Sequence, residues 1–253
     1  MNTNLKTTFG LAVAALASFA VPASAASVTF QNSVGITDTS ALDAPLTYSG
    51  ATLVQALSFG WPPTSQTVVT IGGQTINFVG ANPTWDGPAD ESSTLFHAGG
   101  ENNAGLFTGT TGNTAFDGVL QSQGWCNTGN SAIPSGVRLG GLTTGSLYVV
   151  QLLASDMRAG SAGRTQQYFD TQDFTGNSSD SFSVQSATYV LASFTADASG
   201  FQDIFIKDTR GAGWDTTFAG FTLYSVTAVP EPTALALLAT GAAAVLIRRR
   251  KLS

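Results

Sequence analysis

The sequence has almost none of the residues that carry thiol, imidazole or metal chemistry. It contains one cysteine, Cys126, and one histidine, His97. One thiol cannot form an internal disulfide, and a Ser-His-Asp triad or an ordinary zinc site would have to be built on His97 alone. Glycine-rich phosphate loops, a Gly-x-Ser-x-Gly elbow and a His-Glu-x-x-His motif are absent as well. These absences predict a protein that is not an enzyme.

Charged residues are also scarce, at 10% of the chain, and basic ones are scarcest. Between residues 26 and 228, fifteen acidic residues face five basic ones, so this region carries a net charge of about −10. Nucleic acid and anionic lipid both bind clustered cations. The balance therefore predicts no nucleic-acid partner and a surface made mostly of uncharged polar residues. The five basic residues are Arg138, Arg158, Arg164, Lys207 and Arg210.

The first 25 residues have the pattern of a secretory signal peptide. Lys6 gives a weakly basic start, residues 9–21 form a short apolar segment, and Ala23 and Ala25 are the small residues of a cleavage site. We predict entry into the general secretion machinery and cleavage after Ala25 by signal peptidase. The alternative is an uncleaved N-terminal anchor, for which the apolar segment is short.

The last 25 residues combine a proline-flanked acid, an apolar run and a basic end. Pro230 and Pro232 flank Glu231 and exclude a helix interior there. Residues 234–247 are apolar and, as a helix, would measure about 21 Å, marginal for a hydrocarbon core of roughly 30 Å. Basic clusters such as the one that follows stay on the cytoplasmic side, so the preceding chain is expected outside. The basic cluster consists of Arg248, Arg249, Arg250 and Lys251.

Residues 229–253 therefore resemble the PEP-CTERM sorting signal of Gram-negative bacteria, with Val229-Pro230-Glu231-Pro232, a hydrophobic helix and an Arg-rich end in the same order. The resemblance implies an exosortase as partner, a membrane-embedded transpeptidase-like enzyme expected to cut near the triplet. It also implies transient anchoring in the inner membrane, followed by release or transfer to the cell surface or exterior. The alternative is a plain C-terminal membrane anchor. A Gram-positive sortase signal is disfavoured, because Leu-Pro-x-Thr-Gly does not occur.

Residues 26–228 are predicted to form one all-β domain. Residues 67–71 and 74–78 alternate around Gly72-Gly73, which is typical of a β-hairpin. Residues 147–153 are continuous enough in β-formers to be buried on both faces of a sheet. Regularly spaced short strands predict a β-sandwich. Further strands are predicted over residues 189–195, 201–207 and 218–226.

One short helix is predicted where Phe116, Val119 and Leu120 recur at helical spacing after Asn113-Thr114, whose side chains could cap it.

Part of this domain resembles a second family. Residues 139–152 and 194–197, with Asp156 and Arg158, look like the second half of galactose-binding-like jelly-roll domains common in PEP-CTERM cargo. The resemblance covers residues 138–226 and implies a jelly-roll-like β-sandwich. Many such domains bind glycans and many have no known ligand, so it supports the fold and not an activity.

Several side chains of the domain are candidates for binding. Trp61, Trp85 and Trp214 could stack on a sugar ring, or they could anchor their loops to the core. Asp156 and Arg158 are predicted to form a structural ion pair with Arg164 or with backbone groups, against the alternative that they belong to a site. Asp170, Asp173 and Asp180 are candidates for a calcium site, against the alternative of a solvated loop.

These observations favour an exported cell-surface or extracellular-matrix protein, structural or binding a glycan such as exopolysaccharide, without catalytic activity. The alternative is a secreted polysaccharide hydrolase that uses a carboxylate pair. Glu91 and Glu101 are the only glutamates of the domain, so they would be the first residues to test.

Overall fold

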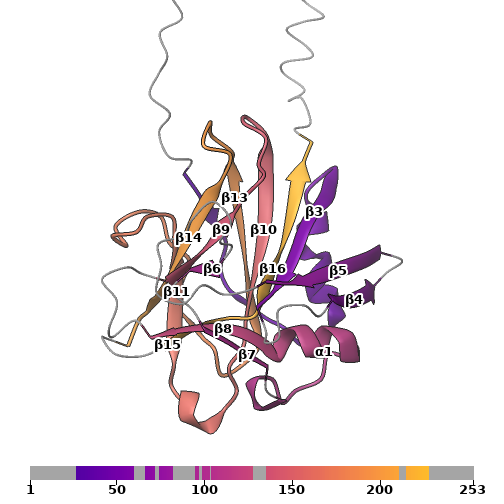
Figure 1. The fold of residues 1–253 in the computed structure, drawn as a ribbon, viewed down its shortest axis with the longest axis vertical. Coiled ribbons are helices and arrows are strands. Elements are labelled where there is room, and N and C mark those ends of the chain that lie inside the picture. Colours follow the sequence, from indigo (N-terminus) through magenta and orange to yellow (C-terminus); the bar gives the residue numbers. More distant parts are fainter. Residues whose placement is uncertain are drawn as a thin grey trace, which may run out of the picture.

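The computed structural model describes residues 27–59, 66–71, 74–81, 95–96, 99–102, 104–127, 135–210 and 215–227, which form an all-β, sandwich-like fold with few helices (Figure 1). Sheet A has the spatial order β1 (Thr29–Phe30), β13 (Thr188–Thr195), β10 (Leu147–Ala154), β16 (Gly220–Val226), β3 (Ala51–Ser58), β5 (Gln74–Gly80) and β4 (Gln66–Ile71), with β2 (Val34–Gly35) also paired to β13. Sheet B has the order β12 (Phe182–Ser183), β11 (Thr165–Phe169), β14 (Gln202–Asp208), β9 (Ser135–Leu139) and β6 (Leu95–Phe96).

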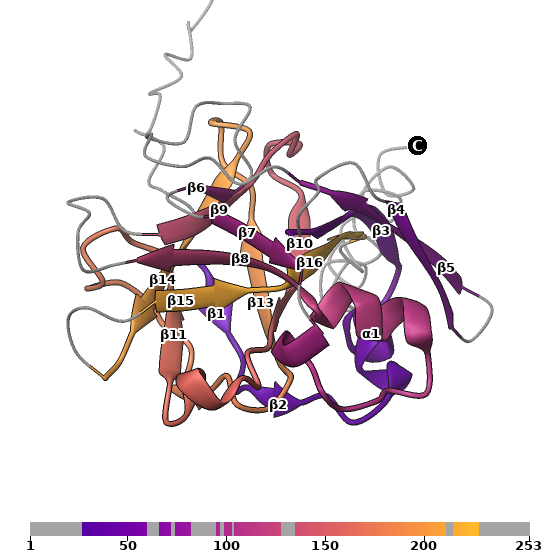
Figure 2. The same ribbon diagram turned by 60° about the horizontal axis from the view of Figure 1, so that its bottom comes forward.

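A third, smaller sheet C contains β15 (Asp215–Phe218), β8 (Ser122–Asn127) and β7 (Gly99–Asn102). It runs across the lower part of the molecule in Figure 1, and Figure 2 brings it to the front together with the α-helix. The helical elements of the described residues are α1 (Thr114–Leu120) and the short 3-10 helices η1 (Thr39–Thr47), η2 (Ala104–Leu106) and η3 (Ala159–Ser161).

The main core lies between sheets A and B. On β10 the alternate residues Tyr148, Val150 and Leu152 face this core, and Ile204 and Ile206 of β14 face it from the other sheet. All five side chains are buried. Burying a side chain of this size stabilises the fold by roughly 1.5–3 kcal/mol, so the alternation along each strand fixes which face turns inward.

Sheet A is covered on its second face as well. Leu153 of β10 packs into a second cluster with residues of η1 and α1. Gln151 of β10 is fully buried on this side, and its amide nitrogen donates to the Ala41 carbonyl of η1 at 2.6 Å. The prediction that residues 147–153 form a strand buried on both faces is therefore confirmed.

The predicted helix and its cap are also confirmed. The Asn113 side-chain oxygen accepts hydrogen bonds from the amides of Ala115 at 3.0 Å and Phe116 at 3.1 Å. These bonds satisfy two of the amides that a helix start leaves without partners. Phe116, Val119 and Leu120 are fully buried against sheet A, as their spacing indicates.

The predicted hairpin is present as the antiparallel pair β4 and β5, with Ile71 opposite Gln74. Its turn residues Gly72 and Gly73 lie outside the described residues. The predicted strand over residues 218–226 is instead divided, because Ala219 passes the chain from sheet C to sheet A. Its amide donates to the Leu153 carbonyl and its carbonyl accepts from the Phe59 amide.

The strands of sheets A and B define two ends of the sandwich. We call one the Thr227 end, formed by Thr227 and the turns at residues 140–146 and 196–200. We call the other the Asp156 end, formed by residues 155–164 and 208–210, where β10 and β14 finish. β16 runs from the Asp156 end, where Gly220 pairs with Ser58, to the Thr227 end, where Val226 pairs with Leu147.

Within the described part of the chain, no helix is long and apolar enough to cross a membrane. The signal peptide predicted over residues 1–25 and the membrane helix predicted over residues 234–247 both lie outside that part.

Candidate functional site

The Thr227 end is closed by short turns that use backbone hydrogen bonds. Leu142 donates its amide to the Gly200 carbonyl at 3.0 Å, and Gly145 donates to the Ala196 carbonyl at 2.7 Å. Gly141, Gly145 and Gly200 have φ angles of +69°, +79° and +73°, which favour glycine. The turns of this end connect the central strands directly, and Thr227 follows the last residue of β16 here.

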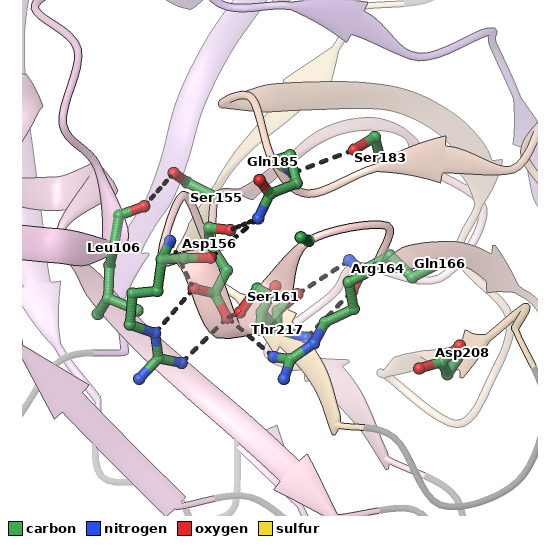
Figure 3. Close-up of polar contacts among 12 residues, drawn as sticks. Leu106, Ser155, Asp156, Ser161, Arg164, Gln166, Ser183, Gln185, Asp208 and Thr217 are labelled. Carbon is green, nitrogen blue, oxygen red and sulfur yellow. Dashed lines mark hydrogen bonds and ion pairs between the residues drawn. The ribbon is translucent and has the colours of Figure 1, made fainter.

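The Asp156 end is organised around one buried carboxylate. Asp156 follows β10 and has no exposed surface. Its oxygens accept from Arg158 Nε at 2.8 Å, Arg158 Nη2 at 3.0 Å and Arg164 Nη1 at 2.8 Å, and from the Ser161 hydroxyl. Figure 3 shows Asp156 with Ser161 beside it and the Arg164 guanidinium directed toward its carboxylate. The predicted ion pair of Asp156 with Arg158 and Arg164 is thus confirmed.

These contacts fix the protonation state of Asp156. Burial alone would raise the pKa of Asp156, because it disfavours the charged form. The hydrogen bonds from Arg158 and Ser161, together with the charges of Arg158 and Arg164, outweigh burial and hold this pKa below its ordinary value. The carboxylate is therefore ionised at neutral pH and is poorly suited to act as a general acid.

A second ion pair lies at the same end. Arg210 donates its backbone amide to Asp208 at 2.7 Å, and its guanidinium lies 3.3 Å from the same carboxylate. The Arg210 Nη1 also reaches the Ala162 carbonyl at 3.4 Å. Three of the five basic residues of the domain therefore gather at the Asp156 end, although the domain as a whole is strongly acidic.

Amide and hydroxyl side chains connect the sheets around these ion pairs. Gln166 of β11 donates to the Thr217 carbonyl at 2.9 Å and accepts from the Thr217 amide at 3.0 Å, which ties sheet B to sheet C. Gln185 donates to the carbonyls of Asp156 and Arg158, both at 3.1 Å. Gln166 and Gln185 both form hydrogen bonds with backbone groups of other segments, so they hold the loops of the Asp156 end in place.

The ion pairs of Asp156 and Asp208 hold the loops of the Asp156 end in place and bring guanidinium groups to it. Both carboxylates are already paired with arginine side chains. In the described ranges no group of three or more His, Cys, Asp or Glu side chains is placed to hold a metal ion. Arg158 is the most accessible member of the Asp156 cluster, with 32% of its side chain exposed. The chemistry available from Asp156 and its partners is binding of polar or anionic groups at the rim.

The predicted glycan-binding residues Trp61, Trp85 and Trp214 lie outside the described residues. Three described residues that flank their segments are Phe59, Ala81 and Asp215. Phe59 and Ala81 lie together beside Ser58, where the Ala81 amide donates to the Ser58 carbonyl at 2.9 Å. Asp215 begins β15, and Asp208, seven residues earlier, closes β14 at the Asp156 end.

The three aspartates proposed for calcium have separate partners. Asp170 accepts from the Val28 amide at 3.2 Å. Asp173 accepts from the hydroxyl of Thr175 at 2.8 Å, in its own turn. Asp180 accepts from Ser33. The structure therefore places them along one loop but does not bring them to a common centre.

Sequence reasoning missed several polar residues of the Asp156 end. Thr165, Thr209 and Ser181 form a chain of hydroxyls with spacings of 2.7 and 2.8 Å. Gln166 and Thr217 are 51 positions apart in the chain. No spacing in the sequence brings such residues together, and only the register of the strands could have identified them.

The comparisons with known proteins concern the C-terminus. Residues 228–251 match the family model described as the PEP-CTERM protein-sorting motif. No curated protein and no solved structure matches the chain. The chain therefore carries the predicted sorting signal, which implies export and processing by an exosortase. None of these comparisons supports the resemblance of residues 138–226 to galactose-binding-like domains.

Proposed function

We propose that the β-sandwich is a non-catalytic module of the cell surface or extracellular matrix, which binds exopolysaccharide through its Asp156 end. The observation that carries the proposal is the position of the sorting motif. It begins at residue 228, directly after Thr227, so the Thr227 end is the one attached to the membrane before processing. The Asp156 end faces away from that attachment.

The span of the sandwich supports this orientation. The eight residues of β10 run from the Thr227 end to the Asp156 end, and at about 3.3 Å per residue they cover roughly 26 Å. Loops at the Asp156 end therefore stand clear of a membrane surface. A ligand outside the cell would meet these loops before the turns of the Thr227 end.

The chemistry of the Asp156 end supports a polar polymer as ligand. Arg158, Arg164 and Arg210 bring guanidinium groups to this end, and Arg158 is the most exposed of them, with 32% of its side chain accessible. Guanidinium groups bind carboxylates and hydroxyls of acidic sugars through paired hydrogen bonds. We propose that Trp61, Trp85 and Trp214 add stacking surfaces for the sugar rings.

The experiment is a pull-down of the processed protein on the exopolysaccharide of its own producer, together with a glycan array. Trp61→Ala, Trp85→Ala and Trp214→Ala are each expected to weaken binding several-fold. Tyr48→Ala is the matched control, since Tyr48 is a half-buried aromatic residue near the Thr227 end. Absence of binding to either material would contradict the glycan version of the proposal.

The same samples test the absence of catalysis. Incubation with the polymer is expected to release no reducing ends. If hydrolysis is observed, the proposal is wrong, and Glu91→Gln and Glu101→Gln then decide whether a glutamate takes part. Hydrolysis that survives both substitutions would require an all-aspartate mechanism.

A further inference from the structure

The strands at the edges of the three sheets differ in length. Within the described part of the chain, the outermost strands β1, β6 and β12 have two residues each, and β7 and β15 have four. β4 forms the other edge of sheet A and has six. An edge strand presents unpaired backbone N–H and C=O groups, and proteins commonly limit this exposure by keeping such strands short. In the described ranges, β4 is therefore the longest open edge.

The sequence of β4 has none of the features that block pairing with another strand. It reads Gln-Thr-Val-Val-Thr-Ile, without proline, glycine or a charged residue. The neighbouring strands β3 and β5 contain no charged residue either. Lysine, proline and inward-pointing charges are the usual protection of an edge, and a six-residue uncharged segment of high β-propensity pairs readily with a further strand. The composition thus leaves this edge open to one more strand.

One face of this region is apolar and exposed. Val68 of β4 lies opposite Asn77 of β5, and Val79 follows two residues later, so all three point to the same side of the sheet. Val68 is 53% exposed and Val79 is 42% exposed. The opposite face is buried, with Val69 and Ile76 in the second cluster. A strand added to β4 would therefore cover apolar side chains beside the open edge.

The exposed face continues across a groove between β5 and β3. These strands are paired at Leu57 with Val79 and at Ser58 with Gly80, and the groove of about 430 Å³ lies along them. Val54, which is 49% exposed, lines it. β3, β4 and β5 lie together at the right of Figures 1 and 2. The surface that leads to β4 is thus uncharged across three strands.

We propose that β4 pairs antiparallel with β4 of a second copy of this chain, so that the two copies of sheet A become one continuous sheet. Charge favours this partner. The region between residues 26 and 228 carries about −10, so two copies repel each other over most of their surfaces, whereas β3, β4 and β5 bring no charge to the contact. A two-fold pair presents the same strand from both copies and closes both edges at once.

The side-chain pattern of β4 determines the register of the pair. A two-fold axis at Val68 sets Val68 against Val68 of the second copy and keeps the exposed faces of both copies on one side. A shift of one residue would join the exposed face of one copy to the buried face of the other. An axis at Val69 would set Val68 against Thr70, which is a less apolar contact. The register centred on Val68 is therefore the one proposed.

The first test measures the mass of the protein, purified from its producing cells or their medium, by sedimentation over a series of concentrations. We expect a species of twice the monomer mass that dissociates on dilution. Val68→Lys places two like charges opposite each other, so it is expected to weaken the pair at least about tenfold. Val34→Lys in β2 is the matched control, because Val34 is also exposed, at 45%, and should leave the dimer intact. Thermal midpoints verify that both variants fold.

The second test examines the register by cross-linking in a chain that carries Cys126→Ser. Val68→Cys brings two thiols together, with Cα atoms about 4.5–5.5 Å apart, and is expected to give a covalent dimer under mild oxidation. Thr70→Cys is the control, because its counterpart lies four residues along the strand, about 13 Å away. Equal cross-linking of the two variants would contradict the register. A monomer at every concentration, a dimer that survives Val68→Lys, or growth beyond the dimer would overturn the proposal.

Discussion

The two ends of the β-sandwich are closed by different means. At the Thr227 end the turns at residues 140–146 and 196–200 bond to each other through backbone groups, with glycines where φ is positive. At the Asp156 end the loops are joined by side chains that are distant in sequence, such as Ser155 with the Leu106 carbonyl and Gln166 with Thr217. Both ends use backbone hydrogen bonds, and the Thr144 hydroxyl also donates to the Asp197 carbonyl at the Thr227 end, but the buried ion pair and the buried amide contacts are found at the Asp156 end.

The difference between the two ends predicts which substitutions lower the stability of the domain most. A turn residue that loses its preferred geometry costs about 1–2 kcal/mol, whereas a buried ion whose partner is removed costs about 3–5 kcal/mol. The end proposed to meet the ligand is therefore also the end whose loops depend on charge. Substitutions at the two ends should separate these contributions.

The largest effect is expected from Asp156→Ala, which leaves Arg164 buried without its carboxylate. We expect the free energy of unfolding to fall by about 3–5 kcal/mol, as for other broken buried pairs. Urea denaturation followed by tryptophan fluorescence measures it. Asp203→Ala is the comparison variant: its pair with Arg138 at 2.7 Å leaves 16–19% of the two side chains exposed, so its removal should cost less than removal of the fully buried Asp156. A similar, small loss from both substitutions would contradict the central role of Asp156.

The same carboxylate should make the Asp156 end sensitive to acid. Its pKa is lowered in the folded protein, so its stabilising contribution is present above the ordinary unfolded value near 3.9 and is lost as pH falls through the lower folded value. Unfolding midpoints of wild type and Asp156→Asn measured from pH 7 to pH 2 should therefore converge in acid. A constant difference across this range would show that the charge contributes nothing.

Next in size is Gly220→Ala, at the point where the chain enters sheet A near the Asp156 end. A Cβ at Gly220 would lie 2.2 Å from the Leu57 carbonyl oxygen, so the backbone of β3 must move. We expect a loss of roughly 1–3 kcal/mol, typical of overpacking. Gly35→Ala in β2 is the control, because nothing lies within 4 Å of a Cβ there. Equal stability of both variants, measured by urea denaturation, would show that the strands can separate freely.

The smallest effect is expected at the Thr227 end, from Gly141→Ala. Its φ of +69° disfavours an L side chain, although a Cβ would meet no atom within 4 Å. We expect a loss of about 1–2 kcal/mol from backbone strain alone. Gly140→Ala is the control, because a Cβ at Gly140 also meets no atom within 4 Å and its φ is not positive. Its thermal midpoint should be nearly unchanged. Equal thermal midpoints of the two variants would contradict a backbone origin.

The difference between local patterns and long-range contacts explains which features the sequence could predict. Alternation along residues 147–153 and the capped helix after Asn113 are local patterns, and both elements formed as predicted. The charge pattern also identified the partners of Asp156, because Arg158 and Arg164 are close to it in sequence. The contacts of Gln166 and Thr209 were not predictable, because they depend on how β11 and β14 align and on where β15 crosses. The break at Ala219 was missed for the same reason, since the sequence around it reads as one continuous strand.

The central claim is that the domain is exported cargo whose two terminal segments are removed. Intact-mass spectrometry of the protein recovered from culture medium and from membranes tests it most directly. We predict a secreted form that lacks residues 1–25 and everything beyond the Pro230-Glu231-Pro232 region. A full-length C-terminus found only in membranes would contradict exosortase processing and would make the chain a plain membrane-anchored protein.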